Sequence, residues 1–146
     1  MFKGKVWKEG HFWLIEVPAL DVITQGTTKE EAFEMIADAI ESLVNMKGFS
    51  VHVKRTGQHE FIVSAEPAAP LIALMFKRQR AKKGLTVEDM RRRLAARSRN
   101  EYYQYEQGKS TPGIDKILQI LKALEIEDAL IFNIERTAET AEKKVA

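Results

Sequence analysis

The sequence predicts an α+β fold in which a small part with the element order β-β-β-α-β-β precedes an all-α part. Strand-like segments and one amphipathic helix fill residues 1–64, and residues 65–70 hold two of the four prolines among small residues. Helical periodicity then runs to about residue 125. We therefore expect a first domain over residues 1–64, a linker over 65–70, an all-α domain over 71–134 and a flexible tail over 135–146.

Five strands are predicted in the first domain from their aromatic and β-branched content. They cover residues 2–7, 11–17, 21–25, 49–55 and 59–64. Glu9-Gly10, between the first two, is typical of a tight hairpin turn, and Pro18 ends the second strand. The domain therefore begins as a hairpin and ends as a second strand pair.

One helix is predicted between the third and fourth strands. Thr28-Lys29-Glu30-Glu31 has the form of a capping box, in which a hydroxyl and a carboxylate satisfy amides at a helix start. The apolar residues that follow recur on one stripe while acidic residues occupy the rest, so one face packs on the sheet. Gly48 is expected to cap the helix at its C-terminal end.

Composition excludes several function classes. The 146 residues include no cysteine and three separated histidines, His11, His52 and His59, so we expect neither disulfides nor a metal site. The acids of the first domain lie mostly along one helix and do not converge, so we expect no catalytic residues, no cofactor and no enzyme activity. No apolar stretch reaches membrane-spanning length and no signal-peptide core is present, so a cytoplasmic location and no membrane are expected.

The order of motifs over about residues 2–64 resembles the HicB antitoxin family. The motifs are the aromatic-rich hairpin, Ile15-Glu16-Val17-Pro18, and the segment from Thr24-Gln25-Gly26 to Glu31-Ala32 that opens the helix. The resemblance implies a small, partial ribonuclease-H-like fold that is degenerate and non-catalytic. It therefore implies a binding module and not an enzyme.

Four helices are predicted after the prolines. The first helix is expected to end near Lys83-Gly84, and Thr86 is expected to cap the second. The third helix is expected to open with another capping box, Ser98-Arg99-Asn100-Glu101. The fourth helix is expected to start at Thr111-Pro112. On the third helix Tyr102 and Tyr105 share one face, which we interpret as core. The opposite face presents polar side chains, of which Asn or Gln can read adenine and Arg can read guanine.

This segment resembles the lambda-repressor-like (Xre-type) helix-turn-helix domain over about 40 residues. The residues that carry the likeness are Leu85-Thr86-Val87-Glu88-Asp89-Met90 and the run from Tyr105-Glu106-Gln107-Gly108 to Pro112. By this correspondence Thr86 and Lys109 would contact phosphates. The recognition helix would contribute Ser98, Arg99, Asn100, Tyr103 and Gln104 as further DNA-binding residues.

Two features depart from that family pattern. Arg91 stands where the family usually has a small residue that lets two helices approach. One extra residue also lies in the turn between Leu94 and Tyr102. Both could alter the crossing of the helices and the DNA preference, although an added arginine attracts phosphates whatever the base geometry.

Charge is distributed unevenly along the chain. Residues 1–66 carry 7 Lys+Arg against 10 Asp+Glu, residues 67–109 carry 11 against 4, and residues 110–146 carry 5 against 7. A basic block of this kind is typical of contact with a polyanion such as DNA, but a solvated helix surface explains it equally well. The apolar residues 129–134 are compatible either with a strand that pairs with its copy in a second chain or with the end of the core.

Together the two resemblances imply the antitoxin of a type II toxin–antitoxin pair. Such a protein masks a small, basic, mRNA-cleaving HicA-like toxin and represses its own operon by binding double-stranded operator DNA. Modules of this size are marginal alone, so we expect a homodimer or higher homo-oligomer. The competing hypothesis is a stand-alone transcriptional regulator whose first domain senses a small molecule in an apolar pocket.

Overall fold

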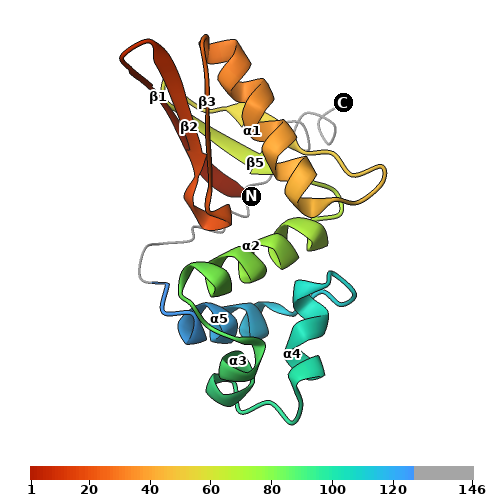
Figure 1. Cartoon of the computed structure of the whole chain (residues 1–146). Coiled ribbons are helices and arrows are strands. Elements are labelled where there is room, and N and C mark those ends of the chain that lie inside the picture. The colour runs from red at the N-terminus through yellow and green to blue at the C-terminus, as the bar shows by residue number, and fades with distance from the viewer. Residues whose placement is uncertain (127–146) are drawn as a thin grey trace, which may run out of the picture.

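A computed structural model describes residues 1–126 and shows mixed α and β structure (Figure 1). The described part contains a five-stranded antiparallel sheet and five α-helices. The elements are β1 (Phe2–Glu9), β2 (Phe12–Val17), the 3-10 turn η1 (Pro18–Leu20), β3 (Val22–Gly26), α1 (Lys29–Val44), β4 (His52–Arg55), β5 (Glu60–Ser64), α2 (Ala69–Lys82), α3 (Val87–Arg93), α4 (Arg99–Glu106) and α5 (Ile114–Ala123). The expectations for residues 129–134 and 135–146 lie outside the described residues.

The sheet has the strand order β3-β2-β1-β5-β4, and every neighbouring pair is antiparallel. The expected hairpin is present: Gly10 adopts a left-handed φ of 61° between β1 and β2. Helix α1 covers one face of the sheet and packs chiefly over β3 and β2 (Figure 1). Side chains alternate along each strand, so each strand directs one set of residues to the face of the sheet that α1 packs on and another to the opposite face.

Helix α1 begins as expected but ends earlier. The Thr28 hydroxyl accepts a hydrogen bond from the Glu31 amide at 3.1 Å, whereas the Glu31 carboxylate accepts from the Thr27 hydroxyl, so only half of the predicted capping box forms. The predicted cap at Gly48 is wrong, because the helix stops at Val44 and Asn45 takes the left-handed conformation with φ 50°. Asparagine tolerates that conformation better than most residues, so it ends the helix one turn before the glycine.

A close approach between β1 and β5 depends on Gly4. A Cβ atom built on Gly4 would lie 2.1 Å from the Phe61 ring, so only glycine leaves room for this side chain on the buried face. Phe61 also packs edge-on against Phe33 of α1, with ring centroids 5.4 Å apart. The glycine therefore allows an aromatic pair to join the helix to the sheet.

Helix α2 packs against both the sheet and the other helices. The predicted stop at Gly84 is confirmed by its φ of 68°, but Ala69 and Pro70, expected in the linker, form the first turn. The buried Gln79 donates hydrogen bonds to the carbonyls of Pro18 and Ala19 at 3.0 and 2.9 Å. Arg78 donates to the next two carbonyls, those of Leu20 and Asp21. Side chains of α2 therefore hold the whole η1 turn.

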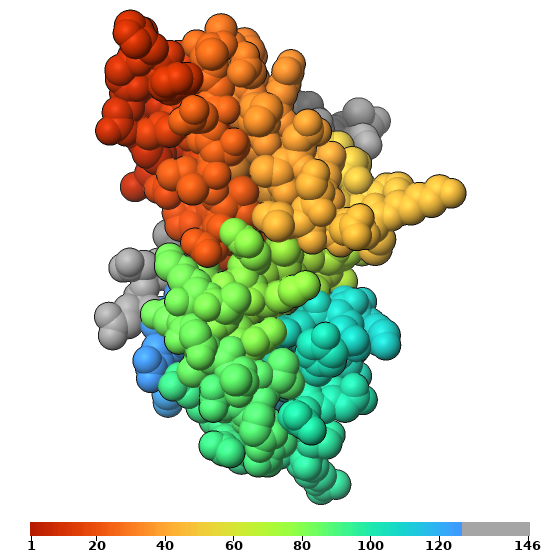
Figure 2. All heavy atoms as spheres, viewed as in Figure 1, coloured from red at the N-terminus to blue at the C-terminus, as the bar shows by residue number. Residues whose placement is uncertain are grey.

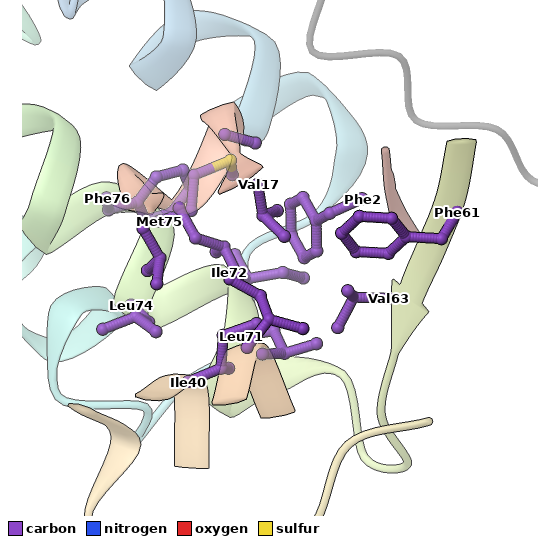
Figure 3. Close-up of a cluster of buried hydrophobic side chains, with 14 of the residues drawn as sticks. Phe2, Val17, Ile40, Phe61, Val63, Leu71, Ile72, Leu74, Met75 and Phe76 are labelled. Atoms are coloured by element: carbon purple, nitrogen blue, oxygen red, sulfur yellow. The ribbon is translucent and has the colours of Figure 1, made fainter. Parts of the chain in front are cut away.

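One cluster of buried hydrophobic residues runs through the described part. Figure 3 shows Phe2, Val17, Ile40, Phe61 and Val63 of the sheet side meeting a run of α2 side chains that includes Leu71, Leu74, Met75 and Phe76. The same cluster continues to Met90 of α3, Tyr102 of α4 and Ile120 of α5. Helix α2 is therefore the element through which the position of α3 and α4 is tied to the sheet. The division into two domains at residues 65–70 stays a prediction.

Candidate nucleic-acid interface

Helices α3 and α4 are two short consecutive helices with well-defined ends. Thr86 caps α3 with a full capping box, in which its hydroxyl accepts from the Asp89 amide at 3.0 Å and the Asp89 carboxylate accepts from the Thr86 amide at 2.8 Å. Helix α3 ends at Arg93; Ala95, just after the C-cap Leu94, has φ 52°, and the Ala96 amide donates to the Arg91 carbonyl in the Schellman pattern. Ser98 then caps α4.

The predicted cap of α4 forms in part. The Ser98 hydroxyl accepts from the Glu101 amide at 3.3 Å, but the Glu101 carboxylate accepts from the Arg97 amide instead of the Ser98 amide. The backbone of Arg97, the residue before the cap, is therefore held by a hydrogen bond as well as that of the helix start. This contact fixes the last residue of the turn between α3 and α4.

Most of the predicted DNA-contacting residues share the exposed side of α4. Asn100, Tyr103 and Gln104 lie on one face by helical geometry, and Tyr103 is 40% exposed. Arg99, at the start of the helix, is 72% exposed. Figure 2 shows α4, in cyan, on the surface of the molecule beside the green α2 and α3. The structure therefore brings these four side chains together at one surface.

The other predicted contacts lie around this face. Thr86 and Ser98 are exposed caps whose hydroxyls already accept a hydrogen bond from a backbone amide, so each retains its own O–H donor for a phosphate. Lys109 is exposed and follows α4, where Gly108 has φ 68°. Gln104 donates its side-chain amide to the Glu101 carbonyl at 3.1 Å, so it must release that bond to reach a base edge.

A buried network holds α4 against α2. The Glu106 carboxylate, whose side chain is 1% exposed, accepts hydrogen bonds from Arg80 at 2.5 and 3.1 Å and from the Tyr102 hydroxyl at 2.6 Å. Arg80 also donates to the Leu85 carbonyl at 3.0 Å. Burial, followed by the negative charge of Glu106, raises the pKa of the Tyr102 hydroxyl well above its ordinary value near 10. The network therefore fixes the rotation of α4 and keeps Tyr102 neutral.

The tyrosines behave as the spacing predicts. Tyr102 is buried, Tyr105 is partly buried against the core, and Tyr103 is exposed. The interpretation of Tyr102 and Tyr105 as core residues is therefore confirmed for the first and holds in part for the second.

Several cations of the basic block are committed to contacts within the molecule. Arg93 donates to the Ala123 carbonyl at 2.7 Å and lies 3.4 Å from the Glu125 carboxylate, so it anchors the end of α5. Lys83 donates to the Glu125 carbonyl at 3.3 Å. Arg78 and Arg80 are also engaged, so these four side chains keep their charge but are held by contacts within the molecule.

Four cations remain exposed around the start and end of α4. Arg92 and Arg99 lie 3.6 and 3.9 Å from the same carboxylate, that of Glu88, and Arg97 and Lys109 make no ion pair with a described residue. The hydrogen bond from Arg91, with the charges of Arg91 and its neighbours, lowers the pKa of Glu88 below its ordinary value. Glu88 therefore stays charged and links α3 to the first residue of α4.

The departure at Arg91 is accommodated without a clash. Its guanidinium turns along α3 to Glu88, with N···O distances of 2.7 to 3.0 Å, and donates to the Ala96 carbonyl at 3.2 Å. The side chain is half-buried at the edge of α3 and does not separate α3 from α4, which pack against each other. Arg91 therefore supports the turn and is not available as a free phosphate ligand.

The predicted start of α5 at Thr111-Pro112 is wrong by two residues. Gly113 is the N-cap, and its carbonyl accepts the first helical hydrogen bond, from the Ile117 amide at 3.0 Å. Pro112 is buried and precedes the helix. A cavity of about 680 Å³ opens between α3 and α5, lined by Arg93, Leu94, Gln119, Lys122, Ala123 and Glu125.

Sequence reasoning missed three parts of this surface. Arg80 and Glu106 are 26 residues apart, so no local pattern reveals that they pair. Gln107 lies seven residues after Asn100 and is exposed at the end of the same face, which helical periodicity could have indicated. The sequence marks Arg97 only as one cation of the basic block, although its place directly before the Ser98 cap puts it beside the exposed polar face of α4.

The sheet side shows a different chemistry. Exposed acidic residues follow the outer surface of α1, namely Glu30, Glu31, Glu34 and Asp38. His59 contacts the Val6 carbonyl at 3.1 Å through Nδ1, and His11 and His52 are exposed on separate strands or turns. Within residues 1–126 no group of three or more His, Cys, Asp or Glu side chains is placed to hold a metal ion.

Helices long and apolar enough to cross a membrane are absent from the described part of the chain. No protein-family model matches the sequence, and no curated protein matches it either.

Proposed function

We propose that this chain is an antitoxin that also represses its own operon. The sheet-bearing part, which consists of β1 to β5 with α1, would bind a HicA-like mRNA-cleaving toxin. Helices α3 and α4 would bind operator DNA as a helix-turn-helix. The observation that carries the DNA half is the polar face of α4, formed by Asn100, Tyr103 and Gln104 with Arg99 at its start. These are residue types that read base edges in the major groove.

The buried network favours this interpretation over simple packing. A helix that contacts DNA must be held in a fixed rotation, because base contacts depend on geometry to within fractions of an ångström. Glu106 receives three hydrogen bonds from Arg80 and Tyr102 and thereby sets that rotation. The side of α4 away from this network is the side left exposed.

The cations fit phosphate contacts on both sides of this face. Arg92, Arg97 and Arg99 gather near the start of α4, and Lys109 follows its end. A helix inserted in the major groove lies between two phosphate backbones, so charge at both ends of the helix supports that placement. Four such contacts correspond to a slope of about −3 to −4 per chain in a plot of log K against log salt.

The first part of the chain supports a protein partner of opposite charge. Residues 1–66 carry a net −3, and Glu34 and Asp38 are exposed on the outer surface of α1. Complementary charge raises the rate at which a basic toxin associates. The sequence likeness to HicB antitoxins and this acidic surface together support toxin binding through the sheet-bearing part.

The DNA half is tested with the duplex that lies upstream of the chain's own gene. Gln104→Ala or Arg99→Ala should each lower affinity by about 1–3 kcal/mol and relax base preference. Gln119→Ala, an exposed glutamine on α5, is the matched control and should leave affinity unchanged. Equal binding by the Gln104 and Gln119 variants, together with equal binding by Arg99→Ala, would contradict the assignment of α4.

The partner half is tested by expressing the chain with the neighbouring open reading frames of its own locus. We expect a small basic protein to co-purify and its RNA cleavage to be suppressed. Asp38→Lys should slow this association, whereas Asp115→Lys, the same charge change on α5, should not. A chain that purifies alone and releases DNA on binding a small molecule would instead support the stand-alone regulator.

A further inference from the structure

The two edges of the sheet differ sharply in character. The β4 edge carries His52, Lys54 and Arg55, and charged side chains of this kind discourage pairing with another strand. The β3 edge reads Val-Ile-Thr-Gln-Gly and has no charged residue, no proline and no interruption of its pairing with β2. Among the described residues β3 pairs with β2 alone. Its outer edge therefore lacks the charged residues, proline and bulge that commonly protect an edge strand.

The side chains of β3 leave apolar surface on the face away from α1. Gly26 lies against the start of α1 at Ala32, and the buried Val22 shares its face by strand alternation, whereas Ile23 points to the opposite face and is 60% exposed. Ile23 and Gln25 alternate with the buried positions, so both point to that open face. Exposure of an isoleucine on an unprotected edge strand is a feature of association surfaces.

Helix α1 adds a second apolar surface beside the same edge. One flank of α1 faces β4, because Glu30 pairs with Arg55 and the Glu41 carboxylate accepts from the Val51 amide. The opposite flank therefore extends toward and beyond β3. It carries Met35 and Leu43, each 40% exposed, with the partly buried Ala39 between them. Figures 1 and 2 show β3 and α1 side by side on the face turned toward the viewer.

We propose that the β3 edge with the Met35–Leu43 flank of α1 is the interface through which two copies of this chain form a symmetric dimer. Antiparallel pairing of β3 with its copy, centred on Thr24, places all five residues of each strand opposite five of the other. Thr24 then faces Thr24 of the partner subunit, Ile23 faces Gln25, and Val22 faces Gly26. Threonine pairs across antiparallel strands are favourable, and no like charges meet.

The two copies of α1 also meet in this dimer. The twofold axis that relates the two β3 strands is perpendicular to the sheet, so both copies of α1 lie on the same face of the continuous sheet. The Met35–Leu43 flank of one α1 then turns toward that of its partner, while Glu34 and Asp38 stay on the outer surface. A pairing of two β4 edges would bring basic residues together, so charge selects β3 as the self-complementary edge.

This inference is independent of DNA or toxin binding, and its tests use the protein alone. The chain has no cysteine, so Thr24→Cys places a single thiol at the predicted axis. Directly opposed residues in antiparallel strands have Cα atoms about 4.5–5.5 Å apart, which a disulfide spans. We expect Thr24→Cys to form a covalent dimer on mild oxidation. Thr56→Cys, an exposed threonine in the β4–β5 turn, is the control and should remain largely monomeric on a non-reducing gel.

Light scattering and sedimentation over a range of concentrations give the second test. Ile23→Lys with Gln25→Lys puts lysine opposite lysine twice, at positions exposed in the single chain, and should raise the dimer dissociation constant by about tenfold or more. Thr56→Lys with Gln58→Lys adds the same charge away from β3 and should leave it unchanged.

Three results would overturn the proposal. The chain could be monomeric at all concentrations with no preferential crosslinking of Thr24→Cys, which would leave the edge to a strand of another protein. Deleting residues 127–146 could abolish a dimer that the β3 lysines do not affect, which would place the contact in that segment. A dimer equally sensitive to the control lysines would reflect net charge and not the edge.

Discussion

Removing the buried charge of Glu106 is the perturbation whose size the structure defines best. Glu106→Gln keeps the volume of the side chain but leaves the Arg80 guanidinium, only 18% exposed, without its anion. Breaking one side of a buried ion pair costs about 3–5 kcal/mol. Arg80 keeps its bond to the Leu85 carbonyl, so we expect the lower end, about 3 kcal/mol in the free energy of unfolding.

A double variant, in which both Arg80 and Glu106 are replaced, tests whether the cost of Glu106→Gln comes from the loss of its partner's charge or from any change at this buried position. Arg80→Met alone leaves a buried carboxylate that keeps only the Tyr102 hydroxyl, and should cost a similar amount. Arg80→Met combined with Glu106→Gln removes both charges, so its cost should fall short of the sum by about 2 kcal/mol or more.

Urea unfolding followed by circular dichroism at the helix band measures these costs. Fluorescence is less suitable, because Trp7 and Trp13 lie on β1 and β2 and report on the sheet. Glu34→Gln, an exposed glutamate on the outer surface of α1, is the control and should change stability by less than about 0.5 kcal/mol. A loss below about 1 kcal/mol for Glu106→Gln, or full additivity in the double variant, would refute the reasoning.

Three further predictions follow from local geometry. Ala95→Gly should stabilise the chain by about 0.5–1 kcal/mol in thermal unfolding, since Ala95 has φ 52° and glycine takes that conformation without steric cost; a loss of stability would contradict this. The pKa of Tyr102 is raised in the folded chain, so the free energy of unfolding that its neutral hydroxyl contributes should be full below about pH 10 and fall as pH rises above that value. Tyr102→Phe should lessen this fall in a pH titration followed by circular dichroism. Lys109→Ala should weaken binding to all duplexes alike and reduce the salt slope by about one, so a change in base preference would count against its phosphate role.

Much of the local structure could be predicted because each feature depends on neighbouring residues. Thr28, Thr86 and Ser98 precede amides that need an acceptor, so they begin helices, and Gly84 and Gly108 allow the left-handed turn that ends them. The end of α1 could not be predicted as well. Asn45 and Gly48 are both able to end a helix, and the choice between them depends on where packing against the sheet stops.

Long-range features left no signal in the sequence. Arg80 pairs with Glu106, 26 positions along the chain. Arg78 and Gln79 donate hydrogen bonds to carbonyls of η1 that lie 58 to 61 positions away. A charged or polar side chain on a helix is exposed in most proteins, so the sequence pattern gives no sign that these side chains are engaged inside the fold. A count of charges along the basic block therefore does not show which of its cations are free to contact a phosphate.

The exposed face of α4 could be predicted, whereas its neighbours could not. Periodicity placed Asn100, Tyr103 and Gln104 on one side of the helix and Tyr102 on the other, as the structure has them. Which arginines accompany this face depends on how α3, α4 and α5 contact one another. That is why Arg93 is turned toward α5 while Arg97 and Arg99 remain exposed.

Selection of binding sites from a pool of random duplex DNA tests the central claim most directly. We expect the chain to enrich a defined sequence, and simultaneous replacement of Arg99, Asn100 and Gln104 by alanine to abolish that enrichment while weak, salt-sensitive binding persists. Alanine at Gln119, Lys122 and Asp115 on α5 should leave the selected sequence unchanged. Enrichment of the same sequence by the α4 variant, or failure of the intact chain to bind any duplex even at low ionic strength, would contradict the account.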